Sequence, residues 1–266
     1  MKAAVVTFPG SNCDRDLALA FERAGFEVVR VWHKDSSLPA GVDVVGVPGG
    51  FSFGDYLRCG AIAAQSPIAG AIQTHAARGG YVLGICNGFQ VLTEMRLLPG
   101  VLMRNAGLKF ACKTVELKVA TTASAFTQSY AKGQSLMIPI AHHDGNYTID
   151  AEGLARLKGE DQIAFTYGQN PNGAMADIAG VLSENRRVLG MMPHPERAND
   201  PVLGGTDGAG LFWNSFFRRD GELFSIGAAS DCGDLVIRRS TDHGATWTRA
   251  EAGRGRLLAA TDGRTQ

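Results

Sequence analysis

Short apolar runs alternate with amphipathic segments along the first 85 residues of the chain. Residues 14–24 place Leu17 and Phe21 on one face at helical spacing, and Gly25 favours an end to that helix. Residues 67–78 are predicted as a second helix. The apolar runs predict strands at residues 2–8, 27–32, 42–47 and 81–85. Strands that alternate with helices in this way predict a parallel sheet covered on both faces.

From residue 109 onward, loops rather than helices separate most of the apolar runs. Two of these runs, residues 109–119 and 135–140, indicate an antiparallel extension of the sheet. Three more runs continue the β-rich part, at residues 163–167, 178–183 and 188–192. Residues 208–218 carry Leu211, Phe212, Ser215 and Phe216 along one side and are predicted as a closing helix. The predicted fold class is α/β, a doubly wound, mostly parallel sheet with helices on both faces and an antiparallel extension. This domain is predicted to span residues 1–219.

The remaining residues, 220–266, differ in composition and contain no lysine. Within them, Ser240–Trp247 fits the S-x-D-x-G-x-T-W pattern of an Asp-box, a hairpin turn that resembles those of sialidase-type propellers. Residues 235–237 and 248–249 are the predicted strands of that hairpin. One hairpin cannot close a propeller, and an isolated two-stranded hairpin is marginally stable in water. We therefore expect a separate tail with a single Asp-box-like hairpin, or a tail without fixed structure.

Charge and cysteine content narrow the functional classes. Lys+Arg and Asp+Glu balance at 26 each, so no net field attracts nucleic acid or an anionic membrane. No apolar run is long enough to span a bilayer, and the N-terminus enters a strand without the layout of a signal peptide, so we expect a cytoplasmic protein. The five cysteines are widely spaced, which favours reduced thiols and no metal site.

The most informative motif is the segment around Cys86, which stands between Gly84 and Gly88 where a strand gives way to a helix. Glycines on both sides favour a nucleophile elbow, a turn that presents a strained nucleophile at the strand's end. The thiol is expected to be displayed at a helix N-terminus, where unpaired N–H groups favour the thiolate form. A lone cysteine after an apolar run is otherwise a small buried hydrophobe.

Two further segments supply partners for this thiol. His194 and Glu196 follow another apolar strand, bracketed by prolines, and together with Cys86 suggest a catalytic triad. Gly50 follows the third predicted strand and would open at the same sheet edge. Its backbone N–H and that of Asn87 are candidate donors to a developing oxyanion. Taken alone, each segment also fits an ordinary turn.

With these residues in place, residues 1–219 resemble the class I glutamine amidotransferase family, most closely the glutaminase subunits that serve purine biosynthesis. The resemblance rests on four stretches, Phe8–Asp14, Pro48–Gly60, Gly84–Gln90 and Pro193–Arg197. It implies that Cys86 attacks the glutamine side-chain amide to form a glutamyl thioester, that His194 relays protons, and that Glu196 orients the imidazole. It further implies that Gly50 is the oxyanion glycine and that Gln90 helps to hold glutamine.

The chain departs from the family pattern at residues 142–145, which read His-His-Asp-Gly where the family often has His-Gly-Glu-Gly. This change leaves the triad untouched and puts any role of His142 in doubt. Cys13, Cys59 and Cys112 are assigned to packing. Asn105 and Phe110 are weaker candidates for a substrate wall, with a structural role equally open.

No phosphate-binding loop of the G-x-x-x-x-G-K-[ST] type occurs in the sequence, so ammonia released here would be used elsewhere. The resemblance implies a separate large synthetase subunit, often with a small third subunit, that uses ATP and magnesium to make formylglycinamidine ribonucleotide. This chain itself is expected to hold no cofactor. Two alternatives stay open: another cysteine hydrolase of the elbow superfamily, and a non-enzymatic binding module defined by the Asp-box.

Overall fold

A computed structural model describes residues 1–212, 216–219, 222–228, 235–240 and 248–249 of the chain. The chain divides into two compact units, Met1–Asn214 and Ser215–Gln266. The sequence placed its domain boundary at residue 219.

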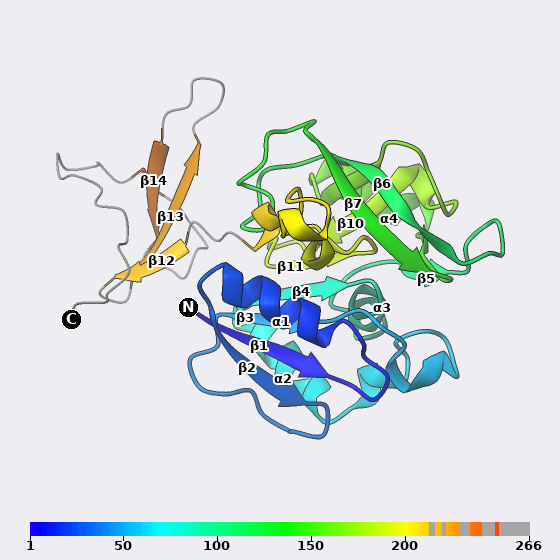
Figure 1. Ribbon diagram of the computed structural model, residues 1–266, viewed down its shortest axis with the longest axis horizontal. Coiled ribbons are helices and arrows are strands. Elements are labelled where there is room, and N and C mark those ends of the chain that lie inside the picture. Colours follow the sequence, from blue (N-terminus) through cyan, green and yellow to red (C-terminus); the bar gives the residue numbers. More distant parts are fainter. Residues whose placement is uncertain (213–215, 220–221, 229–234, 241–247, 250–266) are drawn as a thin grey trace. The chain divides into compact units, whose positions relative to one another are not determined.

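The first unit is built on a nine-stranded sheet with the order β2-β1-β3-β4-β11-β10-β9-β6-β7 (Figure 1). Its strands are β1 (Lys2–Thr7), β2 (Glu27–Trp32), β3 (Val44–Val47), β4 (Tyr81–Ile85), β6 (Ala111–Val119), β7 (Ser135–His142), β9 (Ile163–Tyr167), β10 (Ile178–Leu182) and β11 (Val188–Met191). The first five strands in the sheet order pair in parallel, and every later pairing, from β11 to β10 onward, is antiparallel. The predicted α/β class with its antiparallel extension is confirmed.

Four α-helices accompany this sheet: α1 (Asp14–Arg23), α2 (Ile68–Ala77), α3 (Asn87–Glu94) and α4 (Ala151–Gly159). The connection through α1 leads from β1 outward to β2, whereas the connection through α2 leads from β3 to β4 in the opposite direction. Right-handed crossovers in opposite directions place their helices on opposite faces of the sheet. In doubly wound folds, ligands bind at the point where the direction of the connections changes, at the carboxyl ends of the strands.

The sequence missed β5 (Val101–Met103), β8 (Asn146–Thr148) and α4. The strands β5 and β8 pair only with each other in a small antiparallel sheet. Three residues are too few to show the alternation that identifies a strand. Asp150 is the N-cap of helix α4, and its carboxylate accepts a hydrogen bond from the Gly153 N–H at 2.7 Å. Two glycines weaken the helical signal of its sequence.

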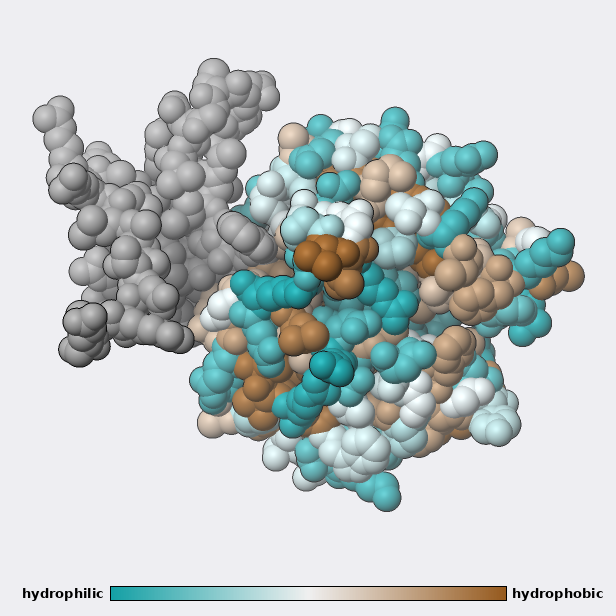
Figure 2. All heavy atoms as spheres, in the orientation of Figure 1, coloured by the Kyte–Doolittle hydropathy of each residue, from teal (hydrophilic) through white to brown (hydrophobic). Residues whose placement is uncertain are grey.

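The central strands β3 and β11 are buried at every position, whereas β6 alternates between buried and exposed positions along most of its length. This difference is expected between a parallel sheet covered on both faces and an antiparallel edge region. The face of the first unit in Figure 2 is mostly hydrophilic, with small, separate hydrophobic patches. Within the described residues, no helix is long and apolar enough to cross a membrane.

The second unit contains a four-stranded antiparallel sheet, β12 (Phe216–Arg219), β13 (Glu222–Ala228), β14 (Leu235–Ser240) and β15 (Thr248–Arg249). The predicted pairing around the Asp-box segment is present, since β14 pairs with β15. Residues 241–247, which hold most of that motif, lie outside the described residues. The sheet is larger than the single hairpin expected from the sequence.

The predicted closing helix at residues 208–218 is wrong. A short 3₁₀ turn occupies Ala209–Leu211, and Phe216–Arg219 form the strand β12. Leu211 and Phe212 are buried, as an apolar helix face would be. Glycines at 208 and 210 disfavour a helix start, and apolar spacing alone did not reveal this.

Candidate active site

Cys86 stands at the sharp turn between β4 and α3, with backbone angles of φ 52° and ψ −109°. Few residues other than glycine adopt a positive φ, and one at this place is typical of a strained elbow. A Cβ added at Gly84 would lie 2.7 Å from the carbonyl oxygen of Gly88, and one added at Gly88 would lie 1.9 Å from that of Val47. Both glycines are therefore required for the turn to pack between the strands.

The expectation that the Cys86 thiol is displayed is wrong. Only 5% of the residue's surface is exposed. Its Sγ lies 3.7 Å from the carbonyl oxygen of Ala141 on β7, a strand of the antiparallel extension. The elbow geometry fixes the thiol at the sheet edge, but the sequence does not show how closely the rest of the domain covers that edge.

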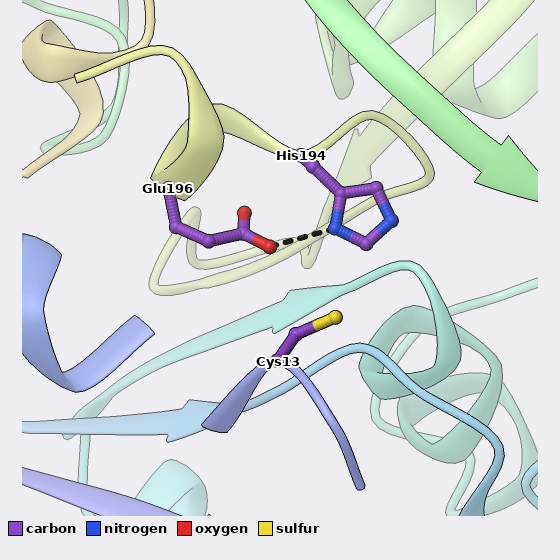
Figure 3. Close-up of side chains that lie close together, drawn as sticks. All are labelled: Cys13, His194 and Glu196. Atoms are coloured by element: carbon purple, nitrogen blue, oxygen red, sulfur yellow. Dashed lines mark hydrogen bonds and ion pairs between the residues drawn. The ribbon is translucent and has the colours of Figure 1, made fainter. Parts of the chain in front are cut away.

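His194 and Glu196 form a buried pair at the carboxyl end of β11 (Figure 3). The Nδ1 of His194 lies 2.6 Å from a carboxylate oxygen of Glu196, and the backbone N–H of His194 donates to the carbonyl oxygen of Pro139 at 2.8 Å. Proline at 195 starts the short 3₁₀ turn that carries Glu196 back toward the ring. Among the described residues, His194 Nε2 and the second carboxylate oxygen of Glu196 have no hydrogen-bond partner.

Opposing effects act on the pKa of His194. Burial lowers this pKa, because a charged imidazolium loses its hydration. The negative charges of the Glu196 carboxylate and of the Cys86 sulfur, together with the thiol of Cys13, outweigh burial, so the pKa lies well above its ordinary value. A pair of this kind holds the imidazole ready to carry a proton beside Cys86.

Gly49 lies close to the side chains of His194, Cys13 and Cys86. A Cβ at this position would lie 2.8 Å from Cε1 of His194, 3.3 Å from Sγ of Cys13 and 3.3 Å from Cβ of Cys86. The missing side chain therefore leaves the space in which His194 faces Cys86. The sequence emphasised the neighbouring Gly50 and gave Gly49 no separate role.

Gly50 has a φ of 136° and packs so closely on the preceding loop that a Cβ would lie 2.7 Å from the backbone nitrogen of Asn12. Only glycine tolerates both features. Its loop is held by the side chain of Asn87, which accepts a hydrogen bond from the backbone N–H of Ser52 at 3.2 Å. The Asn87 N–H lies in the first turn of α3, where backbone donors have no partner within the helix.

Gln90 is buried one turn into α3. Its side-chain oxygen accepts from Asn87 Nδ2 at 2.9 Å, and its Nε2 donates to the carbonyl oxygen of Asp144 at 2.7 Å. Gln90 thus links the elbow to the His-Asp-Gly segment at the end of β7.

The sequence left the role of His142 open, and in the structure this residue is buried. Its Nδ1 lies 3.1 Å from the side-chain oxygen of Asn105, which also accepts from the backbone N–H of Gly145 at 3.0 Å. Burial and the nearby charge of His194 lower the pKa of His142 to about 4, so its ring is neutral near pH 7. Its Nε2 has no hydrogen-bond partner within the part of the chain that the structure describes. Asn105 therefore has a structural role, whereas Phe110 is half exposed.

The cysteines assigned to packing differ from one another. Cys13 is buried beside His194, Cys59 is partly buried with its Sγ 3.5 Å from a carboxylate oxygen of Asp144, and Cys112 is exposed on β6. The assignment of Cys112 to packing is wrong, because the first positions of β6 point to solvent. The sequence missed the proximity of Cys13 to His194, since the two residues meet only through the order of the strands β1 and β11.

Comparisons with known proteins show the family to which the chain is similar. Residues 1–218 match the family described as CobB/CobQ-like glutamine amidotransferase domain. The chain is 74% identical over 212 residues to phosphoribosylformylglycinamidine synthase subunit PurQ of Cereibacter sphaeroides, which covers 80% of this chain and 96% of that protein. It is 56% identical over 211 residues to PurQ of Novosphingobium aromaticivorans, covering 79% of this chain and 94% of the relative.

Two solved structures are similar. The structure of PurLQS from Thermotoga maritima matches with a TM-score of 0.73 and 45% identity, over 79% of this chain and 95% of that chain. The glutaminase domain of Trypanosoma brucei CTPS with bound acivicin matches with a TM-score of 0.54 and 16% identity, over 80% and 91% of the two chains, and shows the shared fold alone. The chain belongs to the glutamine amidotransferase family and, within it, to the PurQ subunits of phosphoribosylformylglycinamidine synthase.

Proposed function

We propose that this chain hydrolyses the side-chain amide of glutamine through a thioester on Cys86 and supplies the ammonia to a synthetase subunit that makes formylglycinamidine ribonucleotide. The observation that carries this proposal is the strained Cys86 elbow facing the buried His194–Glu196 pair across Gly49. The match to PurQ subunits supports the substrate and the pathway. It decides against both alternatives left open by the sequence.

Each of these residues has a different role in the first half-reaction, the formation of the thioester. His194 takes the proton of Cys86, and the sulfur attacks the amide carbon, which places negative charge on the carbonyl oxygen. The backbone N–H groups of Gly50 and Asn87 stabilise that charge, and the loss of one such donor typically costs about 3–4 kcal/mol in the transition state. As the carbon–nitrogen bond breaks, His194 returns the proton to the leaving nitrogen, and ammonia departs.

Water then hydrolyses the thioester with the same imidazole as base, which releases glutamate and restores the thiol. Throughout the cycle Glu196 holds the ring through Nδ1 and stabilises its charged form. Gln90 helps to hold glutamine from its place beside Asn87.

The use of ammonia requires a partner. ATP and magnesium act on the large synthetase subunit, and a small third subunit completes the assembly; this chain contributes no cofactor of its own. The similar structure from Thermotoga maritima carries the name PurLQS, which supports such an assembly. We assign the complex to the cytoplasm, with no nucleic acid or membrane partner.

The test is reconstitution with a candidate synthetase. We expect weak glutaminase activity from the chain alone, because free hydrolysis would waste glutamine, and strong activity when the synthetase and its substrates are added. Cys86→Ala abolishes both, whereas Cys112→Ala, a change at an exposed thiol, leaves both unchanged. Glutamine-dependent amidation that continues in Cys86→Ala would refute the proposal.

A further inference from the structure

The side-chain amide of Asn105 is buried and uses every hydrogen-bonding position that an amide offers, two N–H groups and two lone pairs. Its Nδ2 donates to the carbonyl oxygens of Lys109 and His142 at 2.9 and 3.0 Å. Its Oδ1 therefore faces the other way, where it accepts from Nδ1 of His142 at 3.1 Å and from the Gly145 N–H at 3.0 Å. The amide thus ties its own loop to both ends of residues 142–145.

The hydrogen bond from Gly145 fixes more than one atom, because its N–H belongs to the same peptide group as the carbonyl oxygen of Asp144. This peptide bond is trans, and a trans peptide group is planar, so a partner that fixes the N–H also fixes the direction of the carbonyl group. The Asp144 oxygen accepts from Nε2 of Gln90 at 2.7 Å. Asn105 and Gln90 therefore bind opposite sides of one peptide group.

The chain of hydrogen bonds continues from Gln90 into the active site. Its side-chain oxygen accepts from Nδ2 of Asn87 at 2.9 Å, and the side-chain oxygen of Asn87 accepts from the N–H of Ser52 at 3.2 Å. Within the described residues, these contacts use one N–H and one lone pair of the Gln90 amide. A second N–H and a second lone pair are left for a ligand, and their direction is set by the two contacts already made.

We propose that Asn105 is a positioning residue for glutamine, because it fixes the peptide group that orients the Gln90 amide. The inference rests on the proposed function, in which Gln90 helps to hold glutamine. The side-chain hydrogen bonds of Asn105 within the described residues reach neither Cys86 nor His194. Its loss should therefore weaken the binding of glutamine and spare the chemical step.

The test is the glutamine dependence of the synthetase-activated enzyme. Asn105→Ala should raise the KM for glutamine about fivefold or more, the change expected from a typical net hydrogen-bond contribution, with kcat within about twofold of wild type. Gln162→Ala is the matched control. It removes an equally buried amide, which donates to the carbonyl oxygen of Leu182 at the opposite end of the sheet from Cys86, and should leave KM unchanged.

A double-mutant cycle tests whether Asn105 acts through Gln90. In a Gln90→Ala background, Asn105→Ala should raise KM by less than about twofold, because no amide is left to orient. Equal increases in both backgrounds would contradict this route. Asn105→Ser, which cannot span the same four partners, is the second variant if alanine at this position prevents folding, and the same rise in KM is expected from it.

The inference and the proposed function fail in different ways. An unchanged KM in Asn105→Ala, or a loss of kcat at unchanged KM, would overturn the inference while wild-type glutaminase activity keeps the proposed function. Absence of glutaminase activity in the wild-type enzyme with its synthetase would refute the proposed function, and the inference with it.

Discussion

At the scale of single residues, the negative charge of Glu196 raises the pKa of His194. Burial alone would lower the pKa of His194, and the negative charge of Glu196 is the largest of the effects that raise it. A raised pKa in the folded state means that the folded protein binds the proton more tightly than the unfolded chain. The pair therefore contributes stability below the ordinary pKa of about 6.5, and this contribution is lost as pH rises through the raised pKa.

Glu196→Gln should keep the fold and lower kcat by about 10²- to 10⁴-fold, less than the loss in Cys86→Ala, because it removes the orienting charge and spares the nucleophile. Its free energy of unfolding should fall furthest below that of wild type just under about pH 6.5, with the gap closing at higher pH. Steady-state kinetics and urea unfolding at several pH values measure both effects. Wild-type activity in Glu196→Gln would reduce the triad to a Cys86–His194 dyad.

His142 should give the opposite dependence on pH. Burial is the main cause that lowers its pKa from 6.5 to about 4, so the unfolded chain takes up this proton before the folded protein does. Stability should therefore fall as pH drops from 6.5 to 4, by about 3 kcal/mol for this group. Urea unfolding of His142→Gln should show a shallower fall than wild type over that range. If the free energies of unfolding of the two proteins fell in parallel with pH, the folded state would not lower the pKa of His142.

At the scale of elements, the elbow depends on two close backbone contacts. Gly88→Ala should destabilise the protein by several kcal/mol or prevent folding, because its Cβ would overlap the carbonyl oxygen of Val47. Gly70→Ala is the matched control, since the same methyl group on α2 meets nothing within 4 Å. That change should stabilise the protein by about 0.5–1 kcal/mol. Thermal unfolding of both variants checks the pair, and equal melting temperatures would contradict the packing described for the elbow.

The sequence predicted those elements whose hydrophobic pattern is decided locally. Strands β2, β4 and β9 begin and end at the predicted residues, because each is a short, mostly apolar run. Helix α4 and the closing segment could not be predicted in this way. The glycines of α4 weaken the helical pattern of its sequence. In the closing segment, the spacing of apolar residues predicted a helix that the glycines of the segment disfavour.

At the scale of the whole molecule, the topology decides which chemical groups meet. The sequence identified Cys86, His194 and Glu196 because each follows an apolar strand, and the parallel pairing of β4 with β11 brings their loops to one edge. It missed Gly49 and Cys13 as neighbours of His194. Their proximity follows from the order of the sheet strands, which no local pattern contains.

A chain that ends at Asp220 should keep its melting temperature and its synthetase-activated glutaminase rate. The family match ends at residue 218, and every residue given a chemical role lies before Arg197. Soluble yield, thermal unfolding and glutaminase assays of the truncated and full-length chains make the comparison. A truncated chain that folds normally but loses activity would show that residues 221–266 contribute to the site or to the synthetase interface.

The central claim is that Cys86, and not the neighbouring Cys13, is the nucleophile. Both thiols lie beside His194, so the most direct measurement is covalent labelling by a glutamine analogue that carries an electrophile, followed by peptide mass spectrometry. We expect one label per chain, on Cys86 alone, with loss of activity in proportion to labelling and protection by glutamine. Label on Cys13, Cys59 or Cys112 that rises in parallel with the loss of activity would contradict the account.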